Sequence, residues 1–318
     1  MKKIAIIGSG NIGLSLAKGL VKADFAKAED ITLTRRNIDH LKPFAEAGFV
    51  VSNDNKHAVS NADVVILAVL PQQLNTVLDE INSSIVSAKH LVISVISGVS
   101  CAAVREKLGD DVEVIRVMPN TAIAIGQSMT CMASDNASAE NIDNVTKMFE
   151  TVGSVVKINE DLMTSATALC ACGIAFFLRA IRAASQGGVE IGFHADEALK
   201  MAVQTAKGAA DLLLLHGTHP ESEIDKVTSP KGCTIAGLNE MEHNGFSSSL
   251  IKGIKLSALK AGNFASCAFT CTVIAPKTIS NKDFEIFIIF FCLDILSFKV
   301  CLVFFAKSIC CNHSNYFY

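Results

Sequence analysis

The chain has 318 residues, of which 50% are hydrophobic and 19% are charged, and its formal net charge is −3 at pH 7. This length allows two domains with substantial cores, the composition excludes an intrinsically disordered protein, and the lack of a basic excess argues against nucleic acid as a partner. Eleven cysteines would indicate a secreted disulfide framework only in a much shorter chain, so we expect reduced thiols and a cytoplasmic location.

A glycine-rich loop, Gly8-x-Gly10-x-x-Gly13, joins a short β-branched strand to an amphipathic helix at the start of the chain. Gly8 permits a tight turn, Gly10 lets the backbone approach a pyrophosphate, and Gly13 lets the helix pack against the strand. The free N–H groups and the dipole of the helix N-terminus would then face the phosphates. This arrangement predicts a dinucleotide-binding domain.

The second predicted strand lies in the segment DITLTRR, residues 30–36, and should end beside the adenosine ribose of the cofactor. An acidic residue there would bind the 2′-hydroxyl of NAD, whereas Thr34, Arg35 and Arg36 suit a 2′-phosphate. The arginines could alternatively be a solvated strand end. We therefore expect NADPH as the cofactor, with NADH as the alternative.

Further buried strands are predicted within residues 61–74, 89–100 and 112–134. Their high content of Val, Ile and Leu fits parallel strands that are covered on both faces. Strands and helices alternate to about residue 157, as in a doubly wound sheet. The expected fold class is therefore α/β, with a Rossmann-type doubly wound parallel sheet in residues 1–158.

Residues 159–262 are expected to form an all-helical substrate and dimerisation domain, because long helical patterns replace the strands. Residues 174–188 and 195–217 are so apolar that their helices should bury surface against a second subunit, which gives at least a homodimer. A loop with Pro230 then leads into another helix. Around Gly232, Cys233 and Thr234, the start of that helix would present backbone N–H groups suited to a carboxylate.

The composition changes near residue 263, since residues 264–318 contain ten of the 18 phenylalanines and six of the eleven cysteines. Residues 284–305 are long enough to cross a bilayer, although Asp294 near the centre would cost about 2.5–3.5 kcal/mol. Three interpretations of this apolar tail, residues 263–318, stay open: a membrane anchor, an amphipathic or buried appendage, or a non-native extension such as read-through. We expect no membrane contact for residues 1–262.

Five further segments carry specific patterns: AVLP at 68–71, RVMPNT at 116–121, EDL at 160–162, QGGVEIG at 186–192 and VTSPKGCTIAGL at 227–238. With the glycine loop, their order and spacing closely resemble those of the pyrroline-5-carboxylate reductase family over about residues 3–262. This resemblance implies reduction of 1-pyrroline-5-carboxylate to L-proline by NAD(P)H, the last step of proline biosynthesis. It also implies a small-molecule substrate and a homodimer, or a larger homo-oligomer.

Matching the family residue by residue implies that Thr234 is catalytic, with its hydroxyl against the ring nitrogen of the substrate. The backbone N–H groups of Cys233 and Thr234 would bind the substrate carboxylate. Glu160 matches an acidic residue near the substrate, or else it is a charge at a helix N-terminus beside Asp161. A protonated imine is already electrophilic, so the implied reaction requires little acid catalysis.

The same matching implies a set of cofactor-binding residues: Ile7, Gly8, Ser9, Gly10, Asn11, Ile12, Gly13, Thr34, Arg35, Arg36, Asn55, Ala68, Val69, Leu70, Pro71, Ser97 and Asn120. Asn55 matches a side chain near the adenosine phosphate, with a loop asparagine without a ligand as the simpler alternative. Asn120 either orients the nicotinamide amide or holds its own turn.

The chain departs from the family at three places. The family usually has Ser-Gly-Ser-Gly-Pro-Ala where residues 170–175 read Cys-Ala-Cys-Gly-Ile-Ala, a lysine at Leu70, and SPGGTT where Lys231 and Cys233 stand. We interpret the two thiols at 170 and 172 as packing at a helix start near the substrate. A metal site would need three or four converging ligands, and thiols one residue apart cannot easily form an unstrained disulfide, so we predict no metal site.

Two alternative functions stay open. The chain could be another NADPH-dependent imine reductase or a β-hydroxyacid reductase. The hydroxyacid enzymes, however, carry a catalytic lysine on a central helix, where residues 173–187 offer only Arg179 and Arg182 as basic residues. It could also be a non-catalytic, nucleotide-binding protein attached to a membrane through residues 284–305.

Overall fold

A computed structural model describes residues 2–270, 279–281, 284–295 and 298–307. The chain divides into two compact units, Met1–Ala268 and Phe269–Tyr318. The first unit contains the predicted sheet and the predicted helices. The second unit contains residues 269–318 of the apolar tail.

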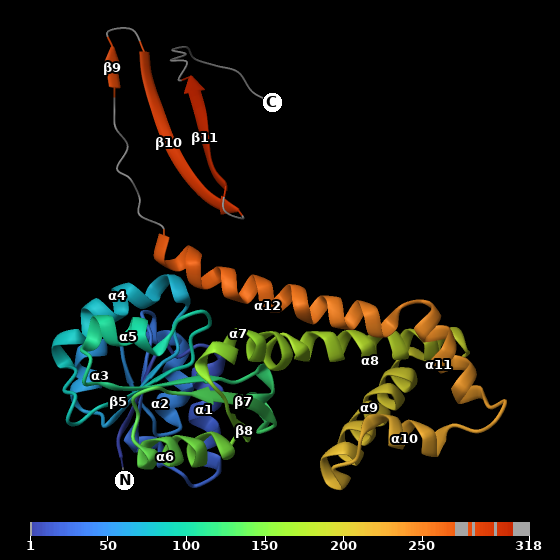
Figure 1. Ribbon diagram of the computed structural model, residues 1–318. Helices are drawn as coiled ribbons and strands as arrows, with labels where there is room; N and C mark the ends of the chain where they lie inside the picture. Colours follow the sequence, from blue (N-terminus) through green and yellow to red (C-terminus); the bar gives the residue numbers. More distant parts are fainter. Residues whose placement is uncertain (1, 271–278, 282–283, 296–297, 308–318) are drawn as a thin grey trace, which may run out of the picture. The chain divides into compact units, whose positions relative to one another are not determined.

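The sheet of the first unit has eight strands in the order β3-β2-β1-β4-β5-β6-β7-β8 (Figure 1). The strand order reverses at β1, which lies between β2 and β4, and this is the switch point where a doubly wound sheet binds its ligand. The predicted α/β fold class is confirmed. The strands are Ile4–Ile7 (β1), Ile31–Thr34 (β2), Val50–Ser52 (β3), Val64–Leu67 (β4), Leu91–Ser94 (β5), Glu113–Met118 (β6), Ser128–Ala133 (β7) and Gly153–Lys157 (β8).

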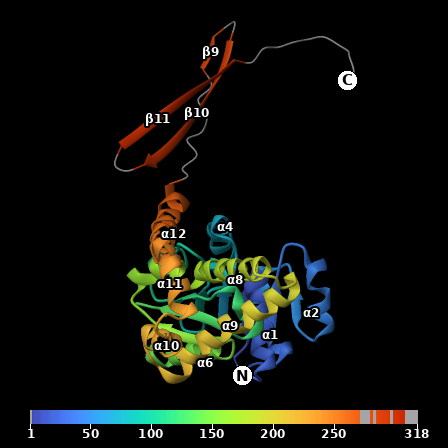
Figure 2. The ribbon, with the colours of Figure 1, turned by 90° about the vertical axis from the view of Figure 1, so that its right-hand side faces the viewer.

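Helices cover both faces of this sheet. Successive residues of each strand point to opposite sides, so each strand contributes to two hydrophobic cores. Ile4 and Ile6 of β1 belong to a core with α1, α2 and α6, whereas Ala5 and Ile7 belong to a core with α3, α4 and α5 (Figures 1 and 2). Both cores explain why the strands read as continuous apolar runs. The helices are Asn11–Lys22 (α1), Lys42–Glu46 (α2), Asn55–Ser60 (α3), Pro71–Ile81 (α4), Cys101–Leu108 (α5) and Ala139–Glu150 (α6).

One strand departs from the predicted parallel arrangement. β7 runs antiparallel to β6, whereas the other neighbouring pairs of this sheet are parallel. The connection from β6 to β7 contains only a 3-10 turn, Thr121–Ile125, and no crossover helix. A short connection of this kind returns the chain alongside the previous strand, so the two strands must run in opposite directions.

After β8 the described chain is helical up to Thr270, as predicted. A 3-10 turn at Glu160–Leu162 opens this half, and α8 and α9 then lie in contact with each other. At their contact, a Cβ on Gly188 would lie 2.9 Å from the Cβ of Ala198, so the glycine allows the close approach. The helices are Met163–Ala166 (α7), Gly173–Glu190 (α8), Ala195–His216 (α9), Pro220–Val227 (α10), Cys233–His243 (α11) and Phe246–Thr270 (α12).

Large apolar side chains of α8 and α9 are exposed in the single chain. Phe177 and Leu178 are 62% and 60% exposed, and Leu214 and Leu215 are both 81% exposed. The stretch Glu160–Glu190 is also long and apolar enough to cross a membrane, with a mean hydropathy of 1.6 over 18 consecutive residues. A helix that packs against a second subunit meets the same criterion, so length and composition alone do not indicate a membrane span.

The second unit contains three strands, Ile279–Asn281 (β9), Phe284–Ile295 (β10) and Phe298–Lys307 (β11). β10 pairs antiparallel with both β9 and β11. The segment 284–305, which as a helix would be long enough to cross a bilayer, is therefore mainly strand. The predicted division of the chain after residue 262, where α12 continues to Thr270, stays a prediction, as do the three interpretations of the tail.

Candidate active site

The glycine loop lies between β1 and α1, and each glycine has its own structural reason. Gly8 has a φ of +88°, and a Cβ there would lie 2.9 Å from the carbonyl oxygen of Ala68. A Cβ at Gly13 would lie 3.0 Å from Cγ2 of Ile6, so this glycine lets α1 pack closely against β1. A Cβ at Gly10 would meet no protein atom within 4 Å. The backbone at Gly10 is therefore open to a ligand.

The start of α1 fits the diphosphate of a dinucleotide. Gly10 is the N-cap residue and makes no side-chain cap, and the first turn contains no acidic residue. The N–H of Gly10 donates to the carbonyl of Gly8 at 2.8 Å. The N–H groups of Asn11 and Ile12 belong to the first turn, where no intrahelical acceptor exists for them. These donors and the helix dipole together favour an anion at this position.

A chain of hydrogen bonds runs beneath the glycine loop. The N–H of Gly8 donates to Oγ1 of Thr34 at 3.4 Å, the Thr34 hydroxyl donates to Oδ1 of Asn55 at 2.7 Å, and Nδ2 of Asn55 donates to Oε2 of Glu80 at 3.0 Å. Thr34 is only 1% exposed, so its hydroxyl points into the protein. Glu80, in α4, is not among the predicted site residues, and no local pattern marks it because Asn55 lies 25 residues away.

Arg35 and Arg36 follow the carboxyl end of β2, and both are exposed. Nη1 of Arg35 donates to the carbonyl oxygen of Ser9 at 3.4 Å, which places its guanidinium beside the glycine loop. The Arg36 side chain makes no hydrogen bond to the residues that the structure describes. The two arginine side chains are therefore accessible at the glycine-loop end of β2.

The predicted residues that follow β4 and β5 lie on the same edge of the sheet. Ala68 and Val69 pack against Gly8, Leu70 is the N-cap of α4 and is 65% exposed, and Pro71 is the first residue of that helix. Ser97 follows β5 and is exposed. Because β1, β4 and β5 are parallel neighbours, their carboxyl ends meet at one edge. The structure thus brings most of the predicted cofactor residues together.

Asn120 is 6% exposed and uses both ends of its side-chain amide within the protein. Its Oδ1 accepts from the N–H of Ala122 at 3.0 Å, which caps the 3-10 turn after β6. Its Nδ2 donates to the carbonyl oxygen of Cys170 at 3.3 Å, in the helical half of the unit. Asn120 therefore holds its own turn, one of the two roles expected for it, and also joins that turn to residue 170.

Glu160 is held by two donors from the sheet domain. Its Oε1 lies 3.3 Å from Nη1 of Arg116 and accepts from the N–H of Cys101 at 2.8 Å. Cys101 is the first residue of α5, so the Glu160 carboxylate lies at the N-terminus of α5, while Glu160 and Asp161 also open the 3-10 turn Glu160–Leu162. Burial, with the negative charge of Glu160 as the next cause, raises the pKa of the Cys101 thiol to about 12. Arg116, in the predicted RVMPNT segment, is the second contact residue that sequence reasoning missed.

Cys170 lies in a π-helical turn, and Cys172, with helical backbone angles, is the residue between that turn and α8. α7 passes into a π-helical turn, Thr167–Ala171, before α8 begins at Gly173. Single π-helical turns within helices are frequent at functional sites. Cys170 and Cys172 are both partly exposed. Among the residues that the structure describes, no group of three or more His, Cys, Asp or Glu side chains is arranged to hold a metal ion.

The start of α11 is open in the same way as the start of α1. Gly232 is the N-cap and makes no side-chain cap, and Cys233 and Thr234 are the first two helical residues. A Cβ at Gly232 would lie 2.4 Å from Oγ of Ser229, so Ser229 would have to move to make room for a larger residue. Lys231 has a φ of +59°, a region that favours glycine. Cys233 is exposed and Thr234 is half-buried.

The predicted site residues thus fall into two groups, one at the edge of the sheet and one at the start of α11. Within the described part of the chain, no hydrogen bond or salt bridge joins Cys233 or Thr234 to the glycine loop. The side-chain hydrogen bonds between the sheet and the helical half are instead those of Glu160, of Asn120 and of Cys131 with Cys170.

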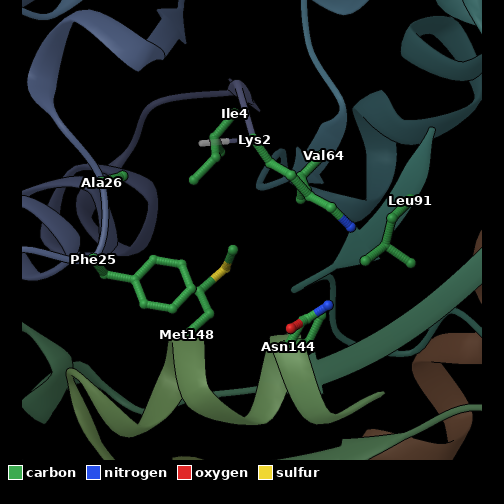
Figure 3. A pocket seen from close by; sticks show the side chains of 9 residues that line it. Lys2, Ile4, Phe25, Ala26, Val64, Leu91, Asn144 and Met148 are labelled. Carbon is green, nitrogen blue, oxygen red and sulfur yellow. The ribbon is translucent and has the colours of Figure 1, made fainter. Parts of the chain in front are cut away.

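Two cavities flank the sheet domain. One, of about 220 Å³, lies where β1, β4 and β5 begin, at the end opposite the glycine loop, and contains none of the predicted residues (Figure 3). Phe25 and Met148 project into it, with Lys2 and Asn144 as its polar members. The other, of about 430 Å³, runs along α1 from Asn11 to Lys18 and reaches Thr121.

The sequence matches two known families and several known proteins. Residues 160–263 match the pyrroline-5-carboxylate reductase dimerisation family, and residues 3–98 match the family of NADP oxidoreductases described as coenzyme F420-dependent. Pyrroline-5-carboxylate reductase 1 of Dictyostelium discoideum is 50% identical over 272 residues, which are 82% of this chain and 49% of that protein. This chain therefore spans about half the length of that relative.

Pyrroline-5-carboxylate reductase 2 of the same organism is 46% identical over 278 residues, which cover 82% of this chain and 92% of that protein. The structure of a pyrroline-5-carboxylate reductase from Coxiella burnetii superimposes with a TM-score of 0.78, at 27% identity, covering 83% of this chain and 98% of that one. The match to a dimerisation domain explains the exposed apolar helices and indicates a homo-oligomer. This chain belongs to the pyrroline-5-carboxylate reductase family, whose members are NAD(P)H-dependent oxidoreductases.

Proposed function

We propose that this chain reduces the C=N bond of 1-pyrroline-5-carboxylate to give L-proline, with NADPH as the preferred cofactor. The observation that carries the proposal is the pair of uncapped helix starts. One, at Gly10, is suited to a diphosphate, and the other, at Gly232, is suited to a carboxylate. A reductase that holds a nucleotide and a small anionic imine needs both kinds of anion site.

The cofactor side of the proposal rests on the glycine loop and on Arg35. The N–H groups of Asn11 and Ile12 hold the diphosphate, while the relay from Gly8 through Thr34 to Asn55 fixes the loop from below. Thr34 and Asn55 then act by positioning the loop, since the Thr34 hydroxyl is buried. Arg35 and Arg36 face the 2′-phosphate that distinguishes NADPH from NADH. When bound, the nicotinamide cofactor supplies the hydride.

The substrate side rests on the first turn of α11. The N–H groups of Cys233 and Thr234 bind the carboxylate, and because these are backbone groups, the cysteine side chain does not interfere. The Thr234 hydroxyl makes no hydrogen bond to the described residues and is therefore available to the ring nitrogen. Glu160 acts as an acidic group near the substrate, from a position that Arg116 and Cys101 fix.

The chain itself needs to provide orientation and exclusion of water more than acid–base chemistry. A ring imine takes up a proton readily, and the protonated form accepts a hydride without a covalent bond to the protein. No thiol is therefore assigned a nucleophilic role in the reduction of the imine. The Thr234 hydroxyl holds the ring nitrogen in place, while the carboxylate on the adjacent carbon is held by the two amides.

The assembly and location follow from the same set of observations. We propose at least a homodimer, formed through α8 and α9, and we leave higher assemblies of such dimers open. We also place the protein in the cytoplasm, where a reducing environment maintains free thiols such as those of Cys101, Cys131, Cys170, Cys172 and Cys233.

The test is an assay of the purified full chain with 1-pyrroline-5-carboxylate and either NADPH or NADH. We expect proline to form in equal amounts with the oxidised cofactor, and the reaction to be faster at low NADPH than at low NADH. Turnover of β-hydroxyacids in preference to the imine would overturn the substrate assignment. Equal kcat/KM values with the two cofactors would overturn only the NADPH preference.

A further inference from the structure

The first thiol of the CACG segment has a thiol partner that is distant in sequence. Cys170, in the π-helical turn, has its Sγ 3.7 Å from Sγ of Cys131, which lies in β7 and is 39 residues earlier in the chain. Cys131 is 5% exposed and belongs to a small apolar cluster with Met118, Ala133 and Met163, against which Cys170 packs. The pair thus lies where the sheet meets the first helices of the dimerisation domain.

The two thiols differ in exposure and in acidity. Cys131 is buried in the sheet, whereas Cys170 is partly exposed. The hydrogen bond from the Cys131 thiol lowers the pKa of Cys170 to about 7, and the same bond, together with burial, raises the pKa of Cys131. An accessible thiolate beside a protonated, buried thiol is the arrangement of an attacking cysteine and its resolving partner.

We propose that Cys131 and Cys170 form a reversible dithiol–disulfide site that a hydroperoxide oxidises. In the first step the Cys170 thiolate attacks one peroxide oxygen, the O–O bond breaks, and with one proton taken up the products are a sulfenic acid and water. In the second step the Cys131 sulfur attacks the sulfenic sulfur, the S–O bond breaks, and the Cys131 proton leaves with the hydroxyl as water. Overall, two thiols and one hydrogen peroxide give one disulfide and two waters.

The geometry favours a disulfide between Cys131 and Cys170 over one between Cys170 and Cys172. A disulfide bond is about 2.05 Å long, so side-chain rotation has to bring the two sulfur atoms about 1.7 Å closer. Cys172 lies only two residues from Cys170 on the same helical stretch, where side chains two apart do not face each other. The bond would connect β7 directly to the helical stretch that leads into α8, and would close the chain between residues 131 and 170.

The proposal can be tested on the reduced full chain, treated with one equivalent of hydrogen peroxide and then digested for mass spectrometry. We expect a cross-link between the peptide with Cys131 and the peptide with Cys170, which dithiothreitol reverses. Because Cys170 and Cys172 share a tryptic peptide, fragmentation must assign the sulfur. Cys172→Ser is the matched control and should keep the cross-link, whereas Cys131→Ser and Cys170→Ser should abolish it.

The wild-type digest decides the question even where a variant does not fold. A bond from Cys170 to Cys172 or to a cysteine of the tail, or sulfinic acid at Cys170 without a cross-link, would overturn the proposal. Thermal unfolding gives a second test: the oxidised wild-type and oxidised Cys172→Ser chains should melt a few degrees above their reduced forms, since a long loop is closed. A lower melting temperature on oxidation would show that the bond does not fit the native packing.

Discussion

The guanidinium of Arg116 and the carboxylate of Glu160 form an ion pair at 3.3 Å, with side chains that are 6% and 22% exposed. The same carboxylate oxygen accepts the N–H of Cys101, so it connects β6, α5 and the turn that opens the helical half. Nε of Arg116 is buried and has no partner among the described residues. The positive charge of the buried guanidinium is therefore balanced mainly by the carboxylate of Glu160.

Glu160→Ala should lower the free energy of unfolding by about 3–5 kcal/mol, because it leaves a buried cation without its counterion. The matched control is Asp143→Ala, which removes the ion pair between Asp143 and Lys157. The Lys157 side chain is 52% exposed and the Asp143 side chain is 66% exposed. That change should cost at most about 1 kcal/mol. Urea unfolding of both variants makes the comparison, and equally small losses would contradict a structural role for the pair.

Gly10→Ala should fold normally but bind NADPH less well, on the order of tenfold, because the new methyl group meets no protein atom and enters the ligand space. Gly8→Ala is the contrasting variant. Its φ of +88° and a Cβ 2.4 Å from Cγ1 of Val69 should destabilise the fold itself, by about 1–3 kcal/mol. Melting temperatures and the KM for NADPH separate the two effects. A lower melting temperature for Gly10→Ala would contradict an open position.

Arg35→Ala should reduce kcat/KM with NADPH by about tenfold to a hundredfold and leave the value with NADH nearly unchanged, because a charged hydrogen bond to the 2′-phosphate is lost. Arg36→Ala should act in the same direction but less, since only Arg35 is fixed against the glycine loop, through Ser9. Lys27→Ala, a loss of one exposed positive charge elsewhere, is the control. An equal decrease of kcat/KM with both cofactors would show that the arginines do not bind the 2′-phosphate.

The sequence predicted the parts of the molecule that local chemistry specifies. Apolar runs bounded by turn residues located β1, β2, β4 and β5, and the glycine spacing located the start of α1. Pro230 and Gly232 likewise indicated the start of α11, because a helix start depends on a few adjacent residues. The helical half after β8 is confirmed as well, because helical periodicity is also a local property of the sequence.

What the sequence did not predict depends on contacts between distant residues. The pairing of Arg116 with Glu160 joins residues 44 apart, and that of Cys131 with Cys170 joins residues 39 apart, so no periodicity reveals them. The inward hydroxyl of Thr34 depends on Asn55 and Glu80 in the following helices. The antiparallel direction of β7 was also not predicted. It depends on the length of the connection from β6, which has no room for a crossover helix, and not on the residues of the strand itself.

His90 should make stability depend on pH. Its Nδ1 accepts the N–H of Val86 at 2.8 Å, so the proton lies on Nε2, 3.1 Å from the carbonyl oxygen of Val59. Burial, and then the charge of Lys89, lowers the pKa of His90 below its usual 6.5, while Asp63 opposes this. The unfolded chain therefore takes up the proton more readily. The stabilisation is complete above pH 6.5 and is lost as the pH falls through the lowered pKa.

The measurement is the free energy of unfolding between about pH 7 and about pH 5. In His90→Gln the decrease on acidification should be shallower than in the wild type. His57→Ala is the control, because His57 is exposed and should leave the slope unchanged. A slope in His90→Gln as steep as that of the wild type would assign the pH dependence to other groups.

Thr234→Ala should lower kcat/KM for 1-pyrroline-5-carboxylate by about tenfold to a thousandfold, the range for the loss of one oriented donor. Thr234 is the second residue of α11, and its hydroxyl makes no hydrogen bond to the described residues, so its removal should not disturb the helix. Thr234→Ser keeps the hydroxyl and should retain most of the activity. Thr228→Ala is the control, because that hydroxyl donates to the carbonyl oxygen of Ile224 at 2.7 Å.

A substrate without a carboxylate separates the role of the backbone amides at the start of α11 from the role of the Thr234 hydroxyl. With 1-pyrroline, the amides of Cys233 and Thr234 have no anion to bind, so KM should rise for every variant. The further loss caused by Thr234→Ala should persist, because the hydroxyl acts on the ring nitrogen and the amides act on the carboxylate. If the loss in Thr234→Ala appears only with the carboxylate substrate, the hydroxyl serves the anion and not the imine. If Thr234→Ala has wild-type kinetics with both substrates, Thr234 lies outside the active site.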